Sequence, residues 1–317
     1  MANALSVKPT TSLTAYLTGD AVKNQINKVV GGSNGDRFIS SLMSAVQANP
    51  TLQECSNSSL VNAALLGYSL NLSPSPQLGY FYFVPFWDND NTYDQHGRVV
   101  NKKAYAAQMH VSEKSLPSVR AAQFQMGYRG YLQLAMRSGQ YKKINTVEIK
   151  EGEFVSYNPL FEELKVNIIE NPDERMQRKS IGYYAMFEYL NGFRKEMYWT
   201  EGQMRAHAQK YSKSYKYGPW STDFDKMANK TLIRQLLGHY GIMSLDMERA
   251  YAADQGVIDE NLSARYVDST IESPIENAKA EIERNANVEM IEMAPEPIQP
   301  AQEPIPAPAP AAQEPDF

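Results

Sequence analysis

Apolar residues recur every three or four positions in the first part of the chain, which is the spacing of one face of a helix. One such run begins at Phe38 and stops before Pro50, because proline disfavours helical backbone in the residue that precedes it. A second run extends from Leu60 to Gly67. The spacing therefore predicts that the N-terminal part is helical, with these apolar side chains in the core.

The pattern changes in the next part of the chain. The segment Leu78–Val84 is short, aromatic and apolar on both faces, and Pro85 follows it, which predicts a buried strand. The alternation over Val119–Met126 predicts a second strand. Helical spacing returns over Tyr128–Ser138, and the glycine that follows, Gly139, is typical of a helix C-terminus.

An antiparallel sheet is predicted for the central part of the chain. Asn191-Gly192 separates two alternating segments, and this dipeptide is the strongest short sequence signal for a β-hairpin. The candidate strands are Ile144–Ile149, Glu153–Tyr157, Leu164–Ile168, Ile181–Leu190 and Phe193–Trp199.

Two helices are predicted after this sheet. Thr200 and Gln203 have the spacing of a capping box, which predicts a helix that begins there and extends toward Tyr211. A similar start at Thr222 predicts a second helix that ends near His239. The chain is therefore predicted to have an α+β fold, with N-terminal helices, an antiparallel sheet and C-terminal helices.

The C-terminal part differs in composition from the rest. Residues 291–317 consist largely of Pro, Ala and Glu, so they are predicted to be a disordered tail that cannot bury enough apolar surface to fold. Residues 251–290 are predicted to be a weakly helical acidic segment. We expect the boundary of the folded domain, residues 1–250, near Tyr251–Gly256.

Charge is distributed unevenly along the chain. The formal net charge is −5, but residues 251–317 contain 14 acidic and 3 basic residues and carry a net charge of −11. That leaves 22 acidic and 28 basic residues, a net charge of +6, for residues 1–250. A basic body with an acidic tail is typical of proteins that bind a polyanion such as nucleic acid.

Composition excludes several classes of protein. The single cysteine, Cys55, excludes a disulfide scaffold and a zinc site made of cysteines, and it fits a reducing compartment. No apolar run approaches the ~20 residues that span a bilayer, and the N-terminus lacks the pattern of a secretory signal. We therefore expect a soluble, cytoplasmic protein with no membrane partner.

Motifs for nucleotide, metal or catalytic sites are missing or incomplete. The sequence has neither a GxxxxGK[ST] loop nor a GxGxxG fingerprint, and its four histidines do not form a zinc-binding pair. The acidic loop that begins at Asp88 has Tyr93 and Val99 where a calcium loop needs Gly and Glu. We expect no cofactor, no metal and no catalytic residue. Glu163-Leu164-Lys165 has the spacing found in metal-dependent nucleases, which leaves a nuclease open as the less favoured alternative.

The positive signal is a set of basic residues interleaved with tyrosines. Lysines and arginines can follow a phosphate backbone, while flat side chains can stack on any base, which together favour sequence-independent binding of single strands. The candidate DNA-binding residues are Lys102, Lys103, Arg120, Arg129, Arg137, Lys142, Lys143, Lys210, Lys213, Lys216, Lys226, Lys230 and Arg234. The candidates for base stacking are Tyr128, Tyr211 and Tyr215.

Several short blocks resemble the RecT family of phage single-strand annealing proteins over roughly residues 20–250. The blocks are Leu70–Pro74, Leu78–Tyr80, Val84–Phe86, Gln123–Tyr131 with Arg137–Gly139, and a later set from Trp220 through Asp223-Phe224, Met227-Ala228 and Lys230-Thr231 to Tyr240-Gly241. The resemblance implies ATP-independent binding of single-stranded DNA and annealing of complementary strands in phage recombination. A protein that only protects single strands, without annealing them, is the alternative.

The resemblance also implies a structure and partners. Tyr80–Phe86 and Val119–Met126 would form the arms of a β-hairpin, with Tyr128–Ser138 as the central helix behind it. The roughly 35 residues Trp87–Ala121 between the arms are longer than the family pattern, and we expect them to form an elongated, mobile basic arm that touches DNA. The implied partners are single-stranded and annealed duplex DNA, further copies in a ring or helical filament, a phage exonuclease and the host single-strand binding protein.

Overall fold

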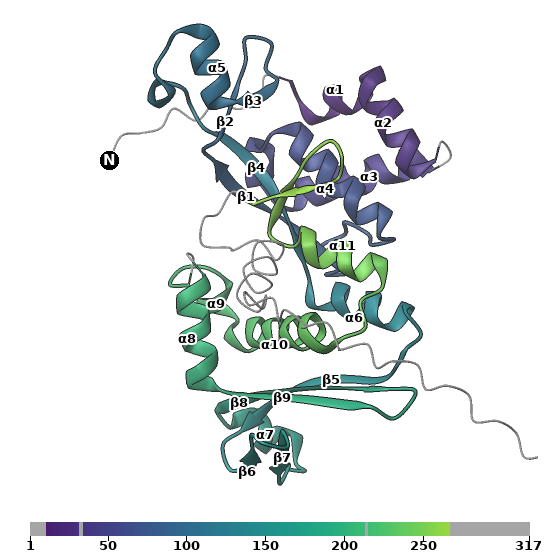
Figure 1. Cartoon of the computed structure of the whole chain (residues 1–317), viewed down its shortest axis with the longest axis vertical. Helices are drawn as coiled ribbons and strands as arrows, with labels where there is room; N and C mark the ends of the chain where they lie inside the picture. Colours follow the sequence, from purple (N-terminus) through teal and green to yellow (C-terminus); the bar gives the residue numbers. More distant parts are fainter. Residues whose placement is uncertain (1–10, 32–33, 213–214, 267–317) are drawn as a thin grey trace, which may run out of the picture. The chain divides into compact units, whose positions relative to one another are not determined.

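The computed structural model describes residues 11–31, 34–212 and 215–266 of the 317-residue chain (Figure 1). It has the predicted α+β architecture with antiparallel sheets. The described N-terminal part is helical, as predicted, and contains α1 (Leu13–Thr18), α2 (Asp20–Val30), α3 (Gly35–Ala48) and α4 (Asn57–Ser69). Helix α4 is buried on nearly all sides because it packs against the first sheet.

The first sheet contains the two strands predicted as hairpin arms. β1 (Phe81–Asp88) pairs antiparallel with β4 (Val119–Met126), in a register that runs from Phe81 opposite Met126 to Asp88 opposite Val119. Two further strands, β10 (Gly256–Ile258) and β11 (Ala264–Arg265), complete the order β1-β4-β10-β11. β4 is therefore an inner strand, which agrees with the burial of most of its residues on both faces.

The residues between these two arms form local secondary structure rather than an extended arm. They contain the short hairpin β2 (Asn91–Tyr93) and β3 (Val99–Asn101), helix α5 (Lys102–Met109) and a 3₁₀ turn, Glu113–Ser115. The prediction of an elongated arm was wrong, because Asp94 accepts hydrogen bonds that close the hairpin and Asn101 caps α5.

The second sheet has the order β5-β8-β9, and its strands are β5 (Tyr141–Lys150), β8 (Ser180–Tyr189) and β9 (Arg194–Thr200). Gly192, with φ +87°, makes the predicted turn between β8 and β9. Between β5 and β8 the chain forms a small lobe with β6 (Phe154–Asn158), β7 (Glu163–Val166) and α7 (Pro172–Gln177). Figure 1 shows α10 lying along this sheet.

Five further helices connect the sheets and cover them. They are α6 (Tyr128–Arg137), α8 (Glu201–Tyr211), α9 (Pro219–Thr222), α10 (Phe224–Tyr240) and α11 (Leu245–Ala253). The predicted capping box is present at the start of α8, where Thr200 and Gln203 bond to each other's backbone. Tyr128–Arg137 agrees with the helix predicted at this position.

The folded part extends beyond the expected boundary near Tyr251–Gly256. β10 adds to the edge of β4, and Asp254 is completely buried. Residues 251–266 therefore belong to the same folded unit as the first sheet. The rest of the predicted acidic segment and the predicted tail, residues 267–317, lie outside the described residues.

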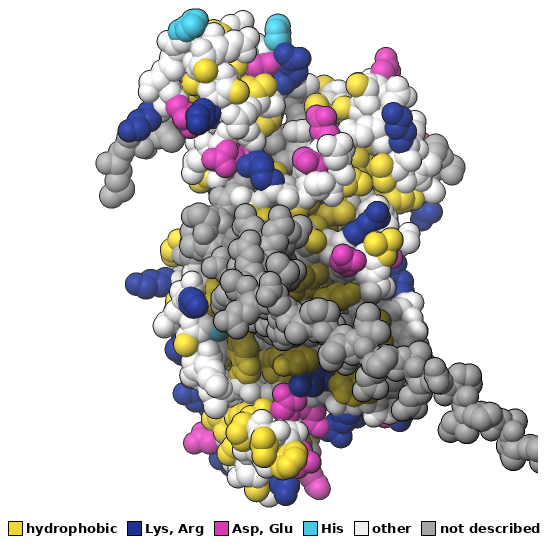
Figure 2. Space-filling view, in the orientation of Figure 1, with side chains coloured by type: hydrophobic (Ala, Val, Ile, Leu, Met, Phe, Trp, Pro, Cys, Tyr) yellow, Lys and Arg dark blue, Asp and Glu magenta, His cyan; other side chains and the backbone are white. Residues whose placement is uncertain are grey.

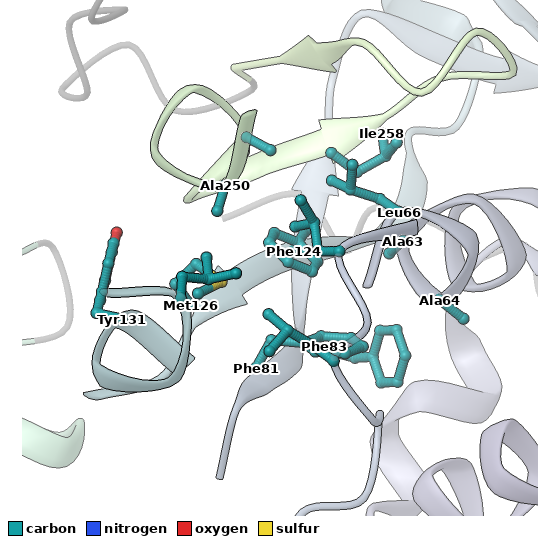
Figure 3. Packing of buried hydrophobic residues seen from close by; sticks show 14 of the residues in the cluster. Ala63, Ala64, Leu66, Phe81, Phe83, Phe124, Met126, Tyr131, Ala250 and Ile258 are labelled. Carbon is teal, nitrogen blue, oxygen red and sulfur yellow. The ribbon is translucent and has the colours of Figure 1, made fainter. Parts of the chain in front are cut away.

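A continuous apolar core joins the N-terminal helices, both sheets and the C-terminal helices. Figure 3 shows its centre, where Phe81 and Phe83 of β1 and Phe124 of β4 meet side chains of α4. The Phe81 and Phe124 rings are 4.8 Å apart between centroids, within the range of favourable aromatic packing. This core fixes the end of β4 from which α6 begins.

Candidate nucleic-acid interface

The start of α6 rests directly on the backbone before β1. The Gly127 N–H donates to the Tyr80 carbonyl oxygen at 2.8 Å. A Cβ on Gly127 would lie 2.0 Å from the Gly79 carbonyl oxygen, and one on Gly130 would lie 2.1 Å from that of Tyr80. Only glycine fits at these two positions of the Gln123–Tyr131 block, so the glycines in that block position the helix.

This docking buries the glycines at the start of α6 and leaves one basic side chain of the first turn exposed. Arg129 is exposed and lies beside Gly79, while Tyr128 is partly buried. Tyr82 of β1, 43% exposed, lies beside the same glycine. Gly127 offers no side chain as an N-cap, and the first turn contains no acidic residue. The Gly127 N–H already donates to Tyr80, so at this helix start the side chain of Arg129 and the positive end of the helix dipole are the features that can attract an anion.

A buried ion pair holds α10 against this helix. Arg234 Nε lies 2.9 Å from Asp254 Oδ2, and the Tyr131 hydroxyl donates to the same oxygen at 2.8 Å. The other carboxylate oxygen accepts a hydrogen bond from the Met126 N–H. Burial, with Asp254 close by, raises the pKa of Tyr131 well above its usual value. Arg234 was predicted to contact DNA, but its guanidinium is engaged in this buried ion pair and stabilises the fold instead.

Lys230 lies one turn before Arg234 and has a different environment. It is partly buried, and burial, with Arg234 as a further cause, lowers the pKa of its ammonium despite the opposing influence of Asp254. Within the described residues its ammonium forms neither a hydrogen bond nor an ion pair. Partial burial of an unpaired cation costs free energy, and binding of an anion beside it would offset that cost.

Lys230 and the start of α6 belong to one neighbourhood around β5. Asn229, the residue before Lys230, donates to Glu148 Oε1 at 2.6 Å. Burial raises the pKa of Tyr128, and the negative charge of Glu148 raises it further. Tyr128 and Asn229 therefore both lie near Glu148, and the helices that carry Arg129 and Lys230, α6 and α10, pack against each other and against β5.

Helix α8 adds bases and rings to this region. Its His207 ring lies between those of Trp199 and Tyr211, with centroid separations of 5.3 and 4.6 Å. The Lys210 ammonium lies over the Tyr211 ring at 4.9 Å. Burial lowers the pKa of His207, and Arg234 and Lys210 lower it further, which places bases of α8 and α10 within electrostatic range of one another.

The segment after α8 contains three further predicted residues. Tyr215 is partly buried, and its hydroxyl accepts a hydrogen bond from Arg205 at 2.9 Å. Lys216 is exposed. Lys213 lies outside the described residues.

A second basic group lies on the β5-β8-β9 sheet. Lys142 and Lys143 are exposed, and Lys142 pairs with Glu188 at 2.6 Å. The hydrogen bond from Lys142, followed by Arg194 and Lys143, holds the pKa of Glu188 below its usual value. Arg194, which the sequence analysis did not select, therefore belongs with these two lysines.

Two other predicted DNA-binding residues, Lys102 and Arg120, form contacts outside this region. Lys102 is only 8% exposed, and its ammonium donates to Ser118 Oγ at 3.1 Å, which removes it from any surface. Arg120 pairs with Glu54 at 2.5 Å. Because Arg120 and Met126 are six residues apart on β4, about 20 Å of strand separates that arginine from α6.

The remaining three predicted DNA-binding residues, Arg137, Lys226 and Lys103, differ in their surroundings. Arg137 donates to the Leu70 carbonyl oxygen at 2.6 Å and so fixes the end of α4. Lys226 is exposed and pairs with Asp223 at 2.8 Å. Lys103 is exposed on α5, next to Lys102. The twelve predicted cations that the structure describes therefore do not form one groove.

The part of the chain that the structure describes has neither a metal-binding cluster nor a membrane-spanning helix. That part contains no group of three or more His, Cys, Asp or Glu side chains able to hold a metal ion, and Glu163 and Lys165 lie at exposed positions of β7. None of its helices combines the length and apolar character needed to cross a membrane.

Comparisons with known proteins cover this region. Residues 36–266 match the model of the RecT family. The chain is 33% identical over 262 residues to the uncharacterized protein YqaK of Bacillus subtilis (strain 168), covering 83% of this chain and 76% of the relative. It is 27% identical over 236 residues to Protein RecT of Escherichia coli (strain K12), covering 74% of this chain and 76% of the relative. The family match includes both sheets together with α6, α8 and α10.

Proposed function

The chain belongs to the RecT family, and on that premise we propose that it binds single-stranded DNA and anneals complementary strands in homologous recombination without ATP. Membership of the family implies single-strand annealing and oligomerisation. The observation that carries the proposal is the unpaired, partly buried Lys230 on α10, a helix that packs against α6, whose first turn exposes Arg129. We propose that the phosphate backbone of a bound strand follows these two helices and contacts both Arg129 and Lys230.

The phosphate contacts extend from this point in two directions. On α8 and the following segment they include Lys210 and Lys216, and on the second sheet Lys142, Lys143 and Arg194. These residues contact the backbone of a strand rather than the edges of its bases, which makes binding independent of sequence. Lys103 contributes at most a peripheral contact, since it lies on α5.

Exposed rings beside these cations supply base stacking. Tyr82 lies next to Arg129, and Tyr211 lies next to Lys210. Tyr128 is partly buried and offers an edge rather than a full face. Each stacked base contributes about 1–3 kcal/mol without regard to its identity, so the rings hold a strand extended without reading it.

Annealing then follows from charge neutralisation and exposure of bases. The first strand lies along the cations with its pairing edges directed outward, so a second strand can test complementarity. Neutralising both backbones removes the repulsion that slows pairing in water. No bond is made or broken in this process, so none of the named residues acts as an acid, a base or a nucleophile.

The experiment mixes two complementary, differently labelled oligonucleotides after the full chain has been added to one of them. Annealing activity is expected to raise the rate of pairing above that of the free strands, in buffer with neither ATP nor divalent metal. A protein that only protects single strands would lower that rate instead. If the protein binds single strands but complementary strands pair more slowly than they do without it, its function is protection rather than annealing.

A further inference from the structure

The lobe formed by residues 151–177 exposes large apolar side chains. Figure 2 shows hydrophobic side chains gathered over the β6–β7 hairpin. In the turn of this hairpin Leu160 is 80% and Phe161 is 69% exposed. The other exposed apolar residues of the lobe are Phe154, Val155, Ile168 and Met176. A contiguous apolar patch on a soluble surface is typical of a site that contacts another protein.

The lobe is held firmly at its base. The buried carboxylate of Glu153 forms an ion pair with Arg175 and accepts hydrogen bonds from the Lys150 and Ile169 N–H groups. Phe154 stacks on Tyr198 of β9 with a centroid separation of 5.7 Å. The lobe is therefore anchored on the second sheet.

The tip is held as well. Asn158 Oδ1 accepts a hydrogen bond from the Leu160 N–H at 2.9 Å, which fixes the turn. Glu162 pairs with Lys195 of β9 at 2.6 Å. Leu160 and Phe161 are thus presented by a preorganised turn, which lowers the entropy cost of docking.

Charge distinguishes the lobe from the rest of the protein. Residues 151–177 contain seven acidic and two basic residues, a net charge of −5. The other residues of 1–250 contain 15 acidic and 26 basic residues, a net charge of +11. The lobe repels the phosphates that the rest of the body attracts, so it does not share the proposed DNA interface.

We infer that this lobe docks on the basic body of a second copy of the chain, with Leu160 and Phe161 as its apolar anchors. Two lobes facing each other would bring two negative patches together, whereas a lobe against a body pairs opposite charges. The contact is therefore heterologous, and repetition of a heterologous contact gives a ring or a helical filament. The inference adds a surface to the oligomerisation implied by the family and does not depend on how DNA is bound.

The first test removes the anchors and measures assembly. Leu160→Ser/Phe161→Ser in the full chain is compared with wild type and with Met136→Ser, which removes another exposed apolar side chain, on α6. Sedimentation velocity without DNA is expected to show self-association weakened by about tenfold or more in the double variant only. Unchanged assembly of the double variant would overturn the inference. Affinity for an oligonucleotide too short to bridge two copies should stay at the wild-type value, which separates this inference from the proposed function.

The second test does not depend on the stability of that variant. A benzophenone photo-crosslinker at position 161 is activated in the purified full chain, and the products are mapped by mass spectrometry. The expected product joins position 161 of one copy to a residue outside 151–177 of another copy. Products that join lobe to lobe would overturn the heterologous contact, and the absence of products between copies would overturn the docking itself.

Discussion

Arg234 of α10 and Asp254 form a buried ion pair that connects three segments far apart in the chain. The nitrogen–oxygen distance is 2.9 Å, and the same carboxylate also holds the Tyr131 hydroxyl and the Met126 N–H. The pair therefore fixes the position of α10 relative to α6 and the end of β4. The relative positions of Arg129 and Lys230, on which the proposed interface depends, follow from it.

Loss of this carboxylate is expected to destabilise the fold strongly. In Asp254→Ala the guanidinium of Arg234 stays buried without its partner, so we expect the free energy of unfolding to fall by about 3–5 kcal/mol. Denaturant titration of the variant measures this difference. Glu248→Ala, which removes an exposed acid from α11, serves as the control and should change stability by at most about 0.5 kcal/mol. An equally small loss for Asp254→Ala would show that the ion pair does not fix α10.

The lobe is expected to lose stability in acid through Glu153. Burial alone would raise the pKa of Glu153, but hydrogen bonds from Arg175 and from two backbone N–H groups outweigh it and hold the pKa below the usual 4.5. A carboxyl group with a lowered folded-state pKa stabilises the fold fully above pH 4.5, and this contribution fades as the pH falls from 4.5 through the lowered value.

Comparison of wild type with Glu153→Gln tests this pH dependence. Denaturant midpoints should differ most near pH 7, and the difference should shrink below pH 4.5. Glu151→Gln, which neutralises an exposed acid of the same lobe, is the matched control. A difference between wild type and Glu153→Gln that stays constant down to pH 3 would contradict the assignment.

Removal of the acidic C-terminal part is expected to leave annealing intact. A chain that ends at Tyr266 keeps every residue assigned to the proposed interface and loses 11 acidic and 2 basic residues. Because a net charge of −9 is removed, affinity for single strands should stay equal or rise. The oligonucleotide mixing assay measures both chains at equal concentration, and a lower annealing rate for the shorter chain would place a required element beyond Tyr266.

The sequence was sufficient for elements whose signals are local. Asn191-Gly192 predicted the turn between β8 and β9, and Thr200 with Gln203 predicted the start of α8. The strand β10 has only three residues, and it is held by pairing with β4, more than 120 residues earlier. Such a strand depends on tertiary context and leaves no local pattern.

The interface was harder to predict than the local elements because it depends on contacts between residues far apart in the chain. Lys226, Lys230 and Arg234 are spaced four residues apart, and residues with this spacing lie on one side of a helix. Each four-residue step turns about 40° around a helix, so the three side chains fan out over about 80°. Lys226 consequently reaches solvent and Arg234 reaches Asp254, while Lys230 lies between them. Which of the three side chains lacks an ion-pair partner depends on Asp254. The role of Asp254 cannot be predicted from the sequence.

The salt dependence of binding to single-stranded DNA tests the central claim most directly. Full-length wild type, Arg129→Ala/Lys230→Ala and the charge-matched control Lys28→Ala/Arg37→Ala are compared on the same oligonucleotide over a range of salt concentrations. The control residues are exposed bases on α2 and α3, outside the proposed interface. Loss of two phosphate contacts predicts weaker binding and a slope of log affinity against log salt that is shallower by about 1.4 for the first variant only. Equal slopes and affinities for all three proteins would contradict the claim that α6 and α10 together bind the phosphate backbone.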